Sequence, residues 1–271
     1  MKLGLEAKVC VVTGATANIG RAIALELAEN GASILAVGRD REAGAKVVAA
    51  ALAAGAAGAE FAAIDLTERD AGERVRAATH GAFGRVDVLV NNVGGNVGIG
   101  PFAESDPESW AHDIDITLGT MLRVTRAVLP GMIAQGSGAI VNIGSTAGLV
   151  GDTMLSVYSA AKGAVHTFTR VLAKEVGKQG VRVNAVAPYS TMAADPEAYS
   201  SGSRFAPGGF FTRAHDTVTG EDMAAIARAP GPLGRQAAVP EEVAALVAYL
   251  ASDRAAFTTG EVMTVSGGVL L

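Results

Sequence analysis

Short apolar runs alternate with longer stretches of helical periodicity along this chain, and that alternation limits the possible folds more than any other feature. Candidate strands lie at 8–13, 33–37, 60–64, 86–91, 138–144, 181–186 and 261–265. Candidate helices lie at about 19–30, 40–54, 67–82, 107–134, 153–178 and 239–251. Strands that alternate with helices pair in parallel, and continuously apolar strands are typical of sheets covered on both faces. The sequence therefore predicts an α/β fold: a Rossmann-like, doubly wound parallel sheet of about seven strands with helices on both faces.

The segment 189–238 breaks this alternation. It has no strand pattern and is rich in Pro, Gly, Ser and Phe. A loop of this length in a compact domain usually covers a binding site. Neither a linker nor an internal repeat is evident, so residues 1–271 are predicted to form a single domain with this substrate-binding loop. Its large apolar side chains favour an apolar substrate or, alternatively, form a small core within the loop: Met192, Phe205, Phe210, Phe211 and Met223.

Composition and charge exclude several kinds of partner. A net charge of −5 and a pI of about 5.4 argue against a nucleic-acid partner or an anionic membrane surface. No apolar run is long enough to span a membrane, and the N-terminal residues lack a signal-peptide pattern, so a cytoplasmic protein is expected. The four histidines have no metal-ligand spacing, and no metal site is predicted. The single cysteine, Cys10, lies in the first apolar run, where a buried, unreactive thiol is expected.

The stretch VVTGATANIGR, residues 11–21, places glycines where the first strand meets the first helix. Glycines in such a turn let a phosphate approach backbone N–H groups, and the helix N-terminus supplies further donors and a partial positive charge. Asn18 stands where a third glycine is usual, and asparagine is the residue other than glycine that best tolerates a left-handed backbone. The turn therefore predicts a dinucleotide site in which Asn18 replaces a glycine beneath the phosphates. Its expected residues are Gly14, Thr16, Asn18, Ile19 and Gly20.

The ends of the second and third strands indicate which dinucleotide binds. An acidic residue at the end of the second strand would receive the ribose 2′-hydroxyl, but this chain has Gly38 followed by Arg39. A guanidinium suits a 2′-phosphate, so NADP is predicted over NAD. The alternative is that Arg39 is a solvated cation paired with Asp40. At the end of the third strand, Asp65 and Leu66 are expected to border the adenine.

A second group of residues points to proton transfer. Tyr158 and Lys162 are four residues apart in a predicted helix, which places them on one face about one turn apart. A lysine ammonium beside a phenol stabilises the phenolate form. Ser145 ends the fifth strand, at the carboxyl edge where active groups of a parallel sheet gather, and its hydroxyl can donate to a carbonyl oxygen. Each feature is common alone, but together, downstream of a dinucleotide turn, they are specific.

With these motifs, nearly the whole chain resembles the short-chain dehydrogenase/reductase family. The motifs are TGxxxxxG at 13–20, NNVG at 91–94, Ser145, YxxxK at 158–162, VRVNAVAP at 181–188 and TGEVMTVSGG at 259–268. The resemblance implies that Tyr158 is the general acid and base and that Ser145 polarises the carbonyl. It also implies that Lys162 holds the nicotinamide ribose and makes the tyrosine a stronger acid.

The resemblance assigns further residues around the cofactor. It implies that Asn91 supports the central strand, and that Asn92, Val93 and Gly94 border the cofactor. The chain from Pro188 to Thr191 would flank the nicotinamide carboxamide.

Three positions depart from the family pattern. One is Asn18. A second is Thr117, in DIDITLGTM, at the place of a catalytic asparagine whose backbone carbonyl binds a water leading to the lysine. Thr117 can preserve that relay, and its side-chain contribution is open. The third is Tyr189, which replaces a glycine near the nicotinamide and is either a wall of the substrate pocket or a packing residue.

Taken together, the sequence predicts an NADP(H)-dependent carbonyl reductase or alcohol dehydrogenase acting on a small or medium apolar ketone or secondary alcohol, cyclic ones included. The alternatives are an NAD-dependent alcohol dehydrogenase of the same fold and a non-catalytic nucleotide-binding regulator. Family members that act on acyl-carrier-protein substrates carry basic residues where this chain has Gly136 and Gln179, which argues against that role. The apolar surfaces of 107–134, 153–178 and the C-terminal VLL predict a homotetramer, or a homodimer, because contiguous apolar surface usually marks an interface.

Overall fold

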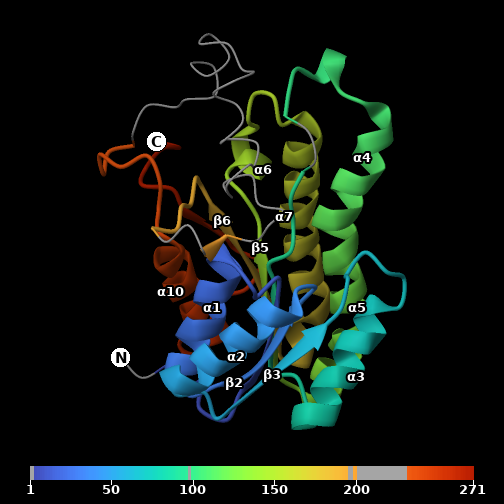
Figure 1. Cartoon of the computed structure of the whole chain (residues 1–271), viewed down its shortest axis with the longest axis vertical. Coiled ribbons are helices and arrows are strands. Elements are labelled where there is room, and N and C mark those ends of the chain that lie inside the picture. The colour runs from blue at the N-terminus through green and yellow to red at the C-terminus, as the bar shows by residue number, and fades with distance from the viewer. Residues whose placement is uncertain (1–2, 97–98, 195–197, 200–230) are drawn as a thin grey trace.

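In a computed structural model, the chain forms one parallel sheet with helices on both faces (Figure 1). The structure describes residues 3–96, 99–194, 198–199 and 231–271. The strand order is β3-β2-β1-β4-β5-β6-β7, and every neighbouring pair is parallel. The strands are β1 Val9–Thr13, β2 Ser33–Gly38, β3 Gly58–Ala63, β4 Val88–Asn91, β5 Gly138–Ile143, β6 Val181–Pro188 and β7 Val262–Val265. This order, which reverses direction between β1 and β4, confirms the predicted doubly wound architecture.

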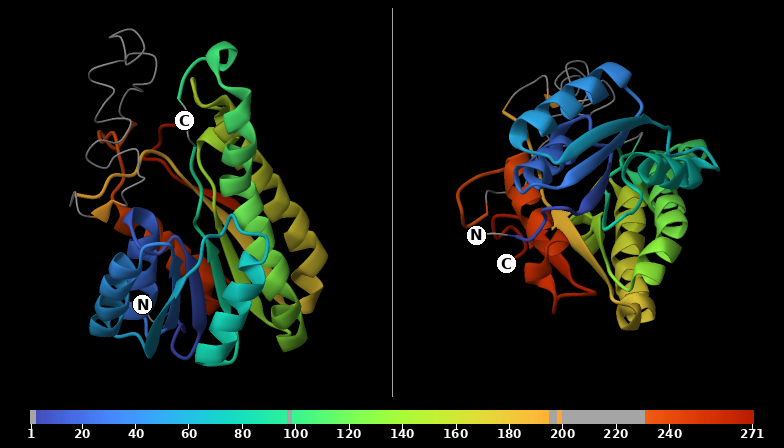
Figure 2. Two further views of the ribbon diagram at one scale, coloured as in Figure 1. Left: turned by 45° about the vertical axis from the view of Figure 1, so that its right-hand side comes forward. Right: turned by 90° about the horizontal axis from the view of Figure 1, so that it is seen from below.

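The helices pack in two layers, one on each face of the sheet (Figure 2). One layer consists of α1 Asn18–Glu29, α2 Arg41–Ala54 and α10 Pro240–Ala251. The other consists of α3 Ala71–Phe83, α4 Pro107–Ile114, α5 Thr120–Gln135 and α7 Ser156–Val176. Two separate apolar cores result, one on each face, and Cys10 is fully buried in the first. Burial raises the pKa of the Cys10 thiol, consistent with the unreactive thiol expected from its place in β1.

The helix boundaries differ from the predicted ones in three places. The helix expected from residue 67 begins at Ala71, because Asp65 folds the preceding residues into a turn by accepting from Thr67. The helix expected over 107–134 contains a π-helical segment, η2 Asp115–Gly119, between α4 and α5. The helix expected over 153–178 is preceded by a separate short helix, α6 Ala147–Val150, and its regular part starts at residue 156.

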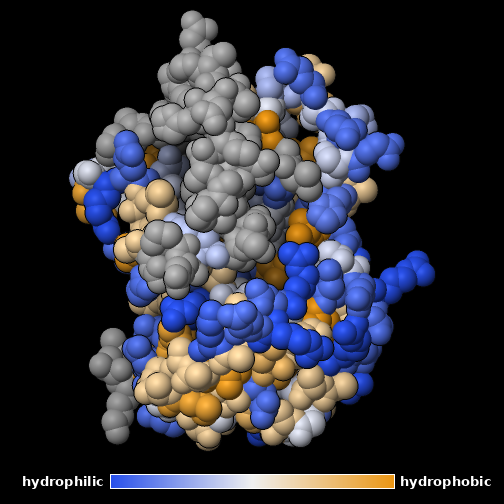
Figure 3. All heavy atoms as spheres, viewed as in Figure 1, coloured by the Kyte–Doolittle hydropathy of each residue, from blue (hydrophilic) through white to orange (hydrophobic). Residues whose placement is uncertain are grey.

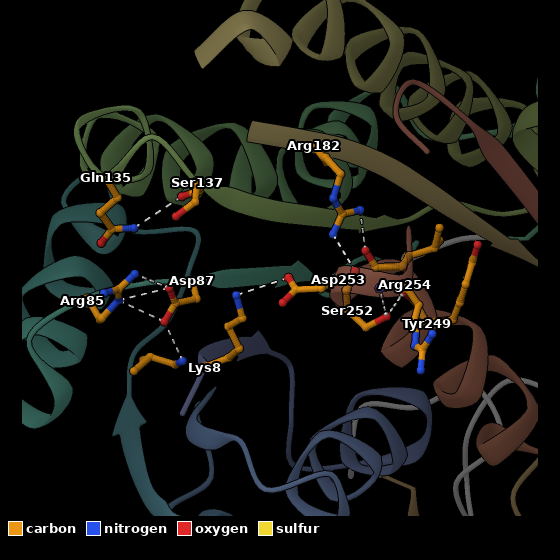
Figure 4. Close-up of polar contacts among 12 residues, drawn as sticks. Lys8, Arg85, Asp87, Gln135, Ser137, Arg182, Tyr249, Ser252, Asp253 and Arg254 are labelled. Atoms are coloured by element: carbon orange, nitrogen blue, oxygen red, sulfur yellow. Dashed lines mark hydrogen bonds and ion pairs between the residues drawn. The ribbon is translucent and has the colours of Figure 1, made fainter. Parts of the chain in front are cut away.

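The amino edge of the sheet is closed by ion pairs and hydrogen bonds (Figure 4). Arg182 at the start of β6 donates to the carbonyl oxygens of Leu250, at 2.8 Å, and Ser252, at 3.0 Å, which end α10. Asp87, 6% exposed, pairs with Arg85 across 2.6 Å and accepts from the backbone of β1. These contacts join helix and strand termini on the side away from the predicted site, so they serve stability.

The predicted substrate-binding loop is described at its two ends and at residues 198–199. An isolated parallel bridge between Thr191 and Ala238 joins these ends. Met192 lies beside the bridge and is 47% exposed. The remaining apolar side chains predicted to face the substrate lie outside the described residues: Phe205, Phe210, Phe211 and Met223.

Candidate active site

The turn between β1 and α1 forms a cradle of backbone groups. Gly14 has a φ of +63°, and Asn18 has a φ of +43°, so the left-handed backbone expected at Asn18 is present. A Cβ at Gly20 would lie 2.1 Å from the carbonyl oxygen of Gly14, so only glycine fits there. The side chain of Asn92 donates to the carbonyl oxygens of Thr13 and Gly14, at 3.0 and 3.2 Å, which fixes the turn from the adjacent strand. The first helical N–H groups therefore face the carboxyl edge of the sheet.

Asn18 adds a polar atom to this cradle. Its side-chain oxygen Oδ1 is buried and has no hydrogen-bond partner among the described residues. The preceding residue, Ala17, gives α1 no side-chain cap, so the donors of the first turn are not used by a cap. The free N–H groups of the first helical turn can donate to the pyrophosphate of a dinucleotide, whereas the Asn18 oxygen can only accept. Thr16 and Ile19 lie in the same turn, as predicted.

Arg39 and Asp65 lie close together at the carboxyl ends of β2 and β3, where the sequence predicts the adenosine ribose. Asp40 accepts from the N–H groups of Glu42 and Ala43 and thereby caps α2. Arg39 is exposed, as the alternative of a solvated cation expects, but Asp40 is not its ion-pair partner. The ion-pair partner of Arg39 is Asp65, with Nη1 3.9 Å from Oδ2. Hydrogen bonds from Thr67 hold the pKa of Asp65 below its usual range, and Arg39 adds to this effect.

Gly38 places no acidic side chain at the end of β2. A Cβ at that position would lie 2.9 Å from Cγ2 of Thr16, so a larger residue requires Thr16 to move. Leu66 follows Asp65 and is 5% exposed, and its carbonyl oxygen accepts from Arg123 at 3.3 Å. Arg123 also pairs with Asp115, so the turn after β3 is tied to the π-helical segment η2.

Tyr158 and Lys162 lie one turn apart on α7, as their spacing predicts. Nζ of Lys162 is 5.8 Å from the centroid of the Tyr158 ring, over its face. Lys162 is only 3% exposed and donates from Nζ to the carbonyl oxygen of Ile143, at 2.7 Å, at the end of β5. A Cβ at Gly94 would lie 2.9 Å from Nζ, so the segment after β4 passes directly beside the ammonium group. A buried cation therefore stands between a phenol and the path expected for the cofactor.

Ser145 follows β5 on the turn into α6. Its Oγ accepts from the N–H of Ala147 at 3.1 Å, which leaves its hydroxyl hydrogen available for donation. The neighbouring Thr146 donates its N–H to the carbonyl oxygen of Pro188 at 3.0 Å, which joins this turn to the end of β6. The structure thus brings Ser145, Pro188 and α7 to one edge of the sheet.

Thr117 lies in the π-helical segment and is buried, with 1% exposed. Its hydroxyl donates to the carbonyl oxygen of Gly95 at 2.8 Å and accepts from the N–H of Gly95 at 3.2 Å. The side chain therefore fixes the loop after β4 beside Gly94 and Lys162. A local widening of a helix often occurs at functional sites, and here it brings Thr117 to that loop.

Buried amides support the strands below the site. Asn91 and Asn142 are register partners in β4 and β5, and the side chain of Asn91 donates to Oδ1 of Asn142 at 2.9 Å. Asn91 also donates to Thr125 of α5, and Asn142 donates to Thr169 of α7. These bonds link the central strands to the helices that carry the site, in agreement with the supporting role expected of Asn91.

Tyr189 begins the chain after β6, and its N–H donates to the carbonyl oxygen of Val265 at 3.0 Å. It lines an open, mainly apolar pocket of about 530 Å³ with Leu233, Val265 and the C-terminal residues Leu270 and Leu271. Two residues later, the hydroxyl of Thr191 donates to the carbonyl oxygen of Tyr189 at 3.2 Å. Tyr189 therefore lines a pocket formed with β7 and the C-terminal residues, and its role toward a substrate stays a prediction.

One polar residue next to the site was missed by the sequence analysis, which took the histidines only as scattered residues without metal-ligand spacing. His166 lies one turn beyond Lys162 on α7 and is 2% exposed, and its Nε2 accepts from the N–H of Ser145 at 3.4 Å. Its four-residue spacing from Lys162 was the available signal. The described residues include no group of three or more His, Cys, Asp or Glu that could hold a metal ion.

A family model described as short chain dehydrogenase matches residues 8–201 of this chain. A second model, described as enoyl-(acyl carrier protein) reductase, matches residues 203–270. The chain is a short-chain dehydrogenase/reductase. Membership in the family, predicted from the motifs, is thereby confirmed, and with it an oxidoreductase that uses a nicotinamide nucleotide cofactor.

Similar members of the short-chain dehydrogenase/reductase family act on different substrates. A 3beta-hydroxysteroid dehydrogenase of Mediterraneibacter gnavus is 34% identical over 96% of this chain and 94% of that protein. A cis-4-hydroxycyclohexanecarboxylate dehydrogenase of Sinomonas cyclohexanicum is 38% identical over 96% of both chains. A 3-oxoacyl-[acyl-carrier-protein] reductase of Vibrio cholerae is 34% identical over 99% of this chain and all of that protein.

Solved structures of other short-chain dehydrogenases/reductases share the fold. The structure of an NAD+-bound xylitol dehydrogenase has a TM-score of 0.84 and 29% identity, over 97% of this chain and 99% of that one. In the described part of this chain, no helix is both long and apolar enough to cross a membrane.

Proposed function

We propose that the chain is an NADP(H)-dependent carbonyl reductase or alcohol dehydrogenase in which Tyr158 is the general acid and base. The observation that carries this proposal is the buried ammonium of Lys162, 5.8 Å from the ring of Tyr158 and fixed by Ile143. Packing alone does not explain this charge, because burying an ammonium group is unfavourable unless polar or charged partners compensate it. Its position favours a negative charge on the phenolate.

In the proposed reaction, the cofactor, Ser145, Tyr158 and Lys162 have separate roles. The nicotinamide nucleotide, when bound, supplies or accepts the hydride. The Ser145 hydroxyl donates a hydrogen bond to the substrate oxygen, because its acceptor side is taken by the N–H of Ala147. Tyr158 donates its proton to that oxygen in the direction of reduction and removes it in the direction of oxidation. Lys162 stabilises the phenolate that this transfer leaves.

Thr117 acts on the same centre by holding Gly95, and so keeps the loop after β4 against Lys162. The pyrophosphate would lie on Gly14, Asn18 and Gly20. Asn92, Gly94, Pro188 and Thr191 would border the nicotinamide half, as the family resemblance implies.

For the substrate, we infer a cyclic or medium-sized apolar secondary alcohol or its ketone. Two relatives are named for a steroid and for a hydroxycyclohexane carboxylate, both cyclic secondary alcohols. The exposed Met192 at the start of the loop favours the same class. An acyl-carrier-protein substrate is the second candidate, because one relative is named for it. Gly136, which caps α5 with a φ of +66°, provides no basic group for such a partner.

The cofactor preference rests on Arg39 and Gly38. The guanidinium is 71% exposed at the edge of the cradle, and its present partner, Asp65, is 3.9 Å away. The alternative, NAD, is favoured by one observation, the NAD+ bound to the structurally similar xylitol dehydrogenase.

A panel of cyclic and linear ketones and alcohols, each with NADPH, NADH and their oxidised forms, tests the function through the absorbance of reduced nicotinamide. Tyr158→Phe is the matched control, because it removes the transferable proton and leaves the ring. We expect its turnover to fall by about 10²- to 10⁴-fold while cofactor binding persists. Cofactor binding without turnover by the wild-type chain on the whole panel would instead indicate a nucleotide-binding regulator.

We further propose that the protein is cytoplasmic and forms a homotetramer or a homodimer. Each chain would form a single domain with its substrate-binding loop at 189–238. Large apolar side chains are exposed on the predicted interface helices: Ile114 45%, Leu122 37%, Ile133 38% and Val171 46%. The C-terminal Leu271 is fully exposed. Figure 3 shows another apolar area over α2 on the lower front face, where Leu52 is 50% exposed. Closed symmetric pairing would bury such surfaces.

A further inference from the structure

His166 is a buried polar side chain that the mechanism above does not use. It comes from α7, one turn beyond Lys162, and its ring fills the space beneath the turn that carries Ser145. A Cβ at Gly144 would lie 2.1 Å from Nε2 of the ring, and a Cβ at Gly148 would lie 2.8 Å from Cε1. The turn from β5 into α6 therefore has glycines where it passes over the imidazole. A side chain at either position would collide with the ring.

The imidazole also makes a polar contact with the turn. The N–H of Ser145 donates to Nε2 of His166 at 3.4 Å, and no other described group accepts from that N–H. Since Nε2 accepts, the ring proton resides on Nδ1, which is buried and has no hydrogen-bond partner among the described residues. An aliphatic side chain of similar size could fill the same space, but it would leave the Ser145 N–H without an acceptor. The imidazole is thus retained for its acceptor rather than for packing.

The ring is neutral at ordinary pH. Burial, together with the cations Lys162 and Arg170 on the same helix, lowers the pKa of His166 to about 4, against an opposing backbone contact with Gly148. The turn packed against the ring, from Gly144 to Gly148, carries no charged side chain. A neutral ring keeps the lone pair that the Ser145 N–H requires.

We propose that His166 is a positioning residue, whose Nε2 fixes the backbone of Ser145 and so directs the Ser145 hydroxyl at the substrate oxygen. The proposal rests on the function proposed above for Ser145. The bond is long, and its effect lies in geometry rather than in stability. A displacement of about 1 Å in a catalytic group can reduce turnover by about 100-fold.

The test uses three variants of His166 in the full chain. His166→Leu keeps the volume and removes the acceptor. His166→Gln places an acceptor near the position of Nε2, whereas His166→Asn places one near Nδ1. We expect the Leu and Asn variants to lose about 10- to 100-fold in kcat with an unchanged dissociation constant for the cofactor, and the Gln variant to recover most of the loss. Melting temperature and cofactor binding report whether each variant is folded.

A double-mutant cycle with Ser145→Ala separates positioning from a general structural role. Once the Ser145 hydroxyl is absent, His166→Leu should have little further effect on the residual kcat, because groups that act through one another are not additive. Three results would overturn the proposal: full additivity in the cycle, wild-type kcat in His166→Leu, or equal activity of the folded Gln and Asn variants. If the wild-type chain itself shows no turnover, it is the proposed function that fails.

Discussion

Removing the guanidinium of Arg39 should weaken NADPH binding and leave NADH binding nearly unchanged. In the structure Arg39 is 71% exposed and pairs with Asp65 across 3.9 Å. An exposed ion pair of this kind contributes about 0–1 kcal/mol. Moving the guanidinium from Asp65 to a 2′-phosphate therefore loses little stabilisation. Hydrogen bonds from a charged donor contribute roughly 1.5–3 kcal/mol. The difference, about 0.5–3 kcal/mol, corresponds to an about 2- to 140-fold weaker NADPH complex in Arg39→Ala.

Titration of each variant with NADPH and with NADH, followed by nicotinamide fluorescence, gives both dissociation constants. Arg41→Ala is the matched control, because Arg41 is an exposed arginine two residues away at the start of α2. It should change neither constant by more than about 2-fold, as is usual for a surface substitution. Arg39→Lys keeps the charge without the planar fork and should give an intermediate loss. Equal losses for both cofactors in Arg39→Ala, or a wild-type preference for NADH, would refute the reasoning.

Three further outcomes are expected. Arg182→Met removes two hydrogen bonds to the end of α10 and should lower stability by about 2–3 kcal/mol, read as a fall in Tm; an unchanged Tm would contradict this. The pKa of His166 is about 4 when folded and near 6.5 when unfolded, so the unfolded state takes up the proton first as the pH falls. The wild-type chain should therefore lose up to about 3 kcal/mol between pH 6.5 and 4 in denaturant titrations, and His166→Gln should lose less. Deleting residues 269–271 should reduce the mass seen by light scattering before it reduces Tm, whereas a wild-type monomer would exclude the proposed assembly.

The alternation of strand and helix patterns in the sequence determined the architecture. Strand and helix periodicities are local properties, and parallel pairing follows from their alternation, so the sheet and the position of the cradle at Gly14 could be predicted. The same holds for Tyr158 and Lys162, because a spacing of four residues fixes their relative position on any helix. Asn18 was also predictable, since its backbone preference is a property of the residue itself.

Details between distant segments were decided only by the tertiary structure. The partner of Arg39 is Asp65 rather than Asp40, because β2 and β3 end at the same edge while Asp40 turns back to cap α2. His166 lies 21 residues from Ser145, and no periodicity connects the two. Their contact requires α7 to pack against the turn after β5, with glycines at 144 and 148 that admit the ring. Local sequence fixes which way a chain turns, but contacts of this kind depend on how whole elements pack.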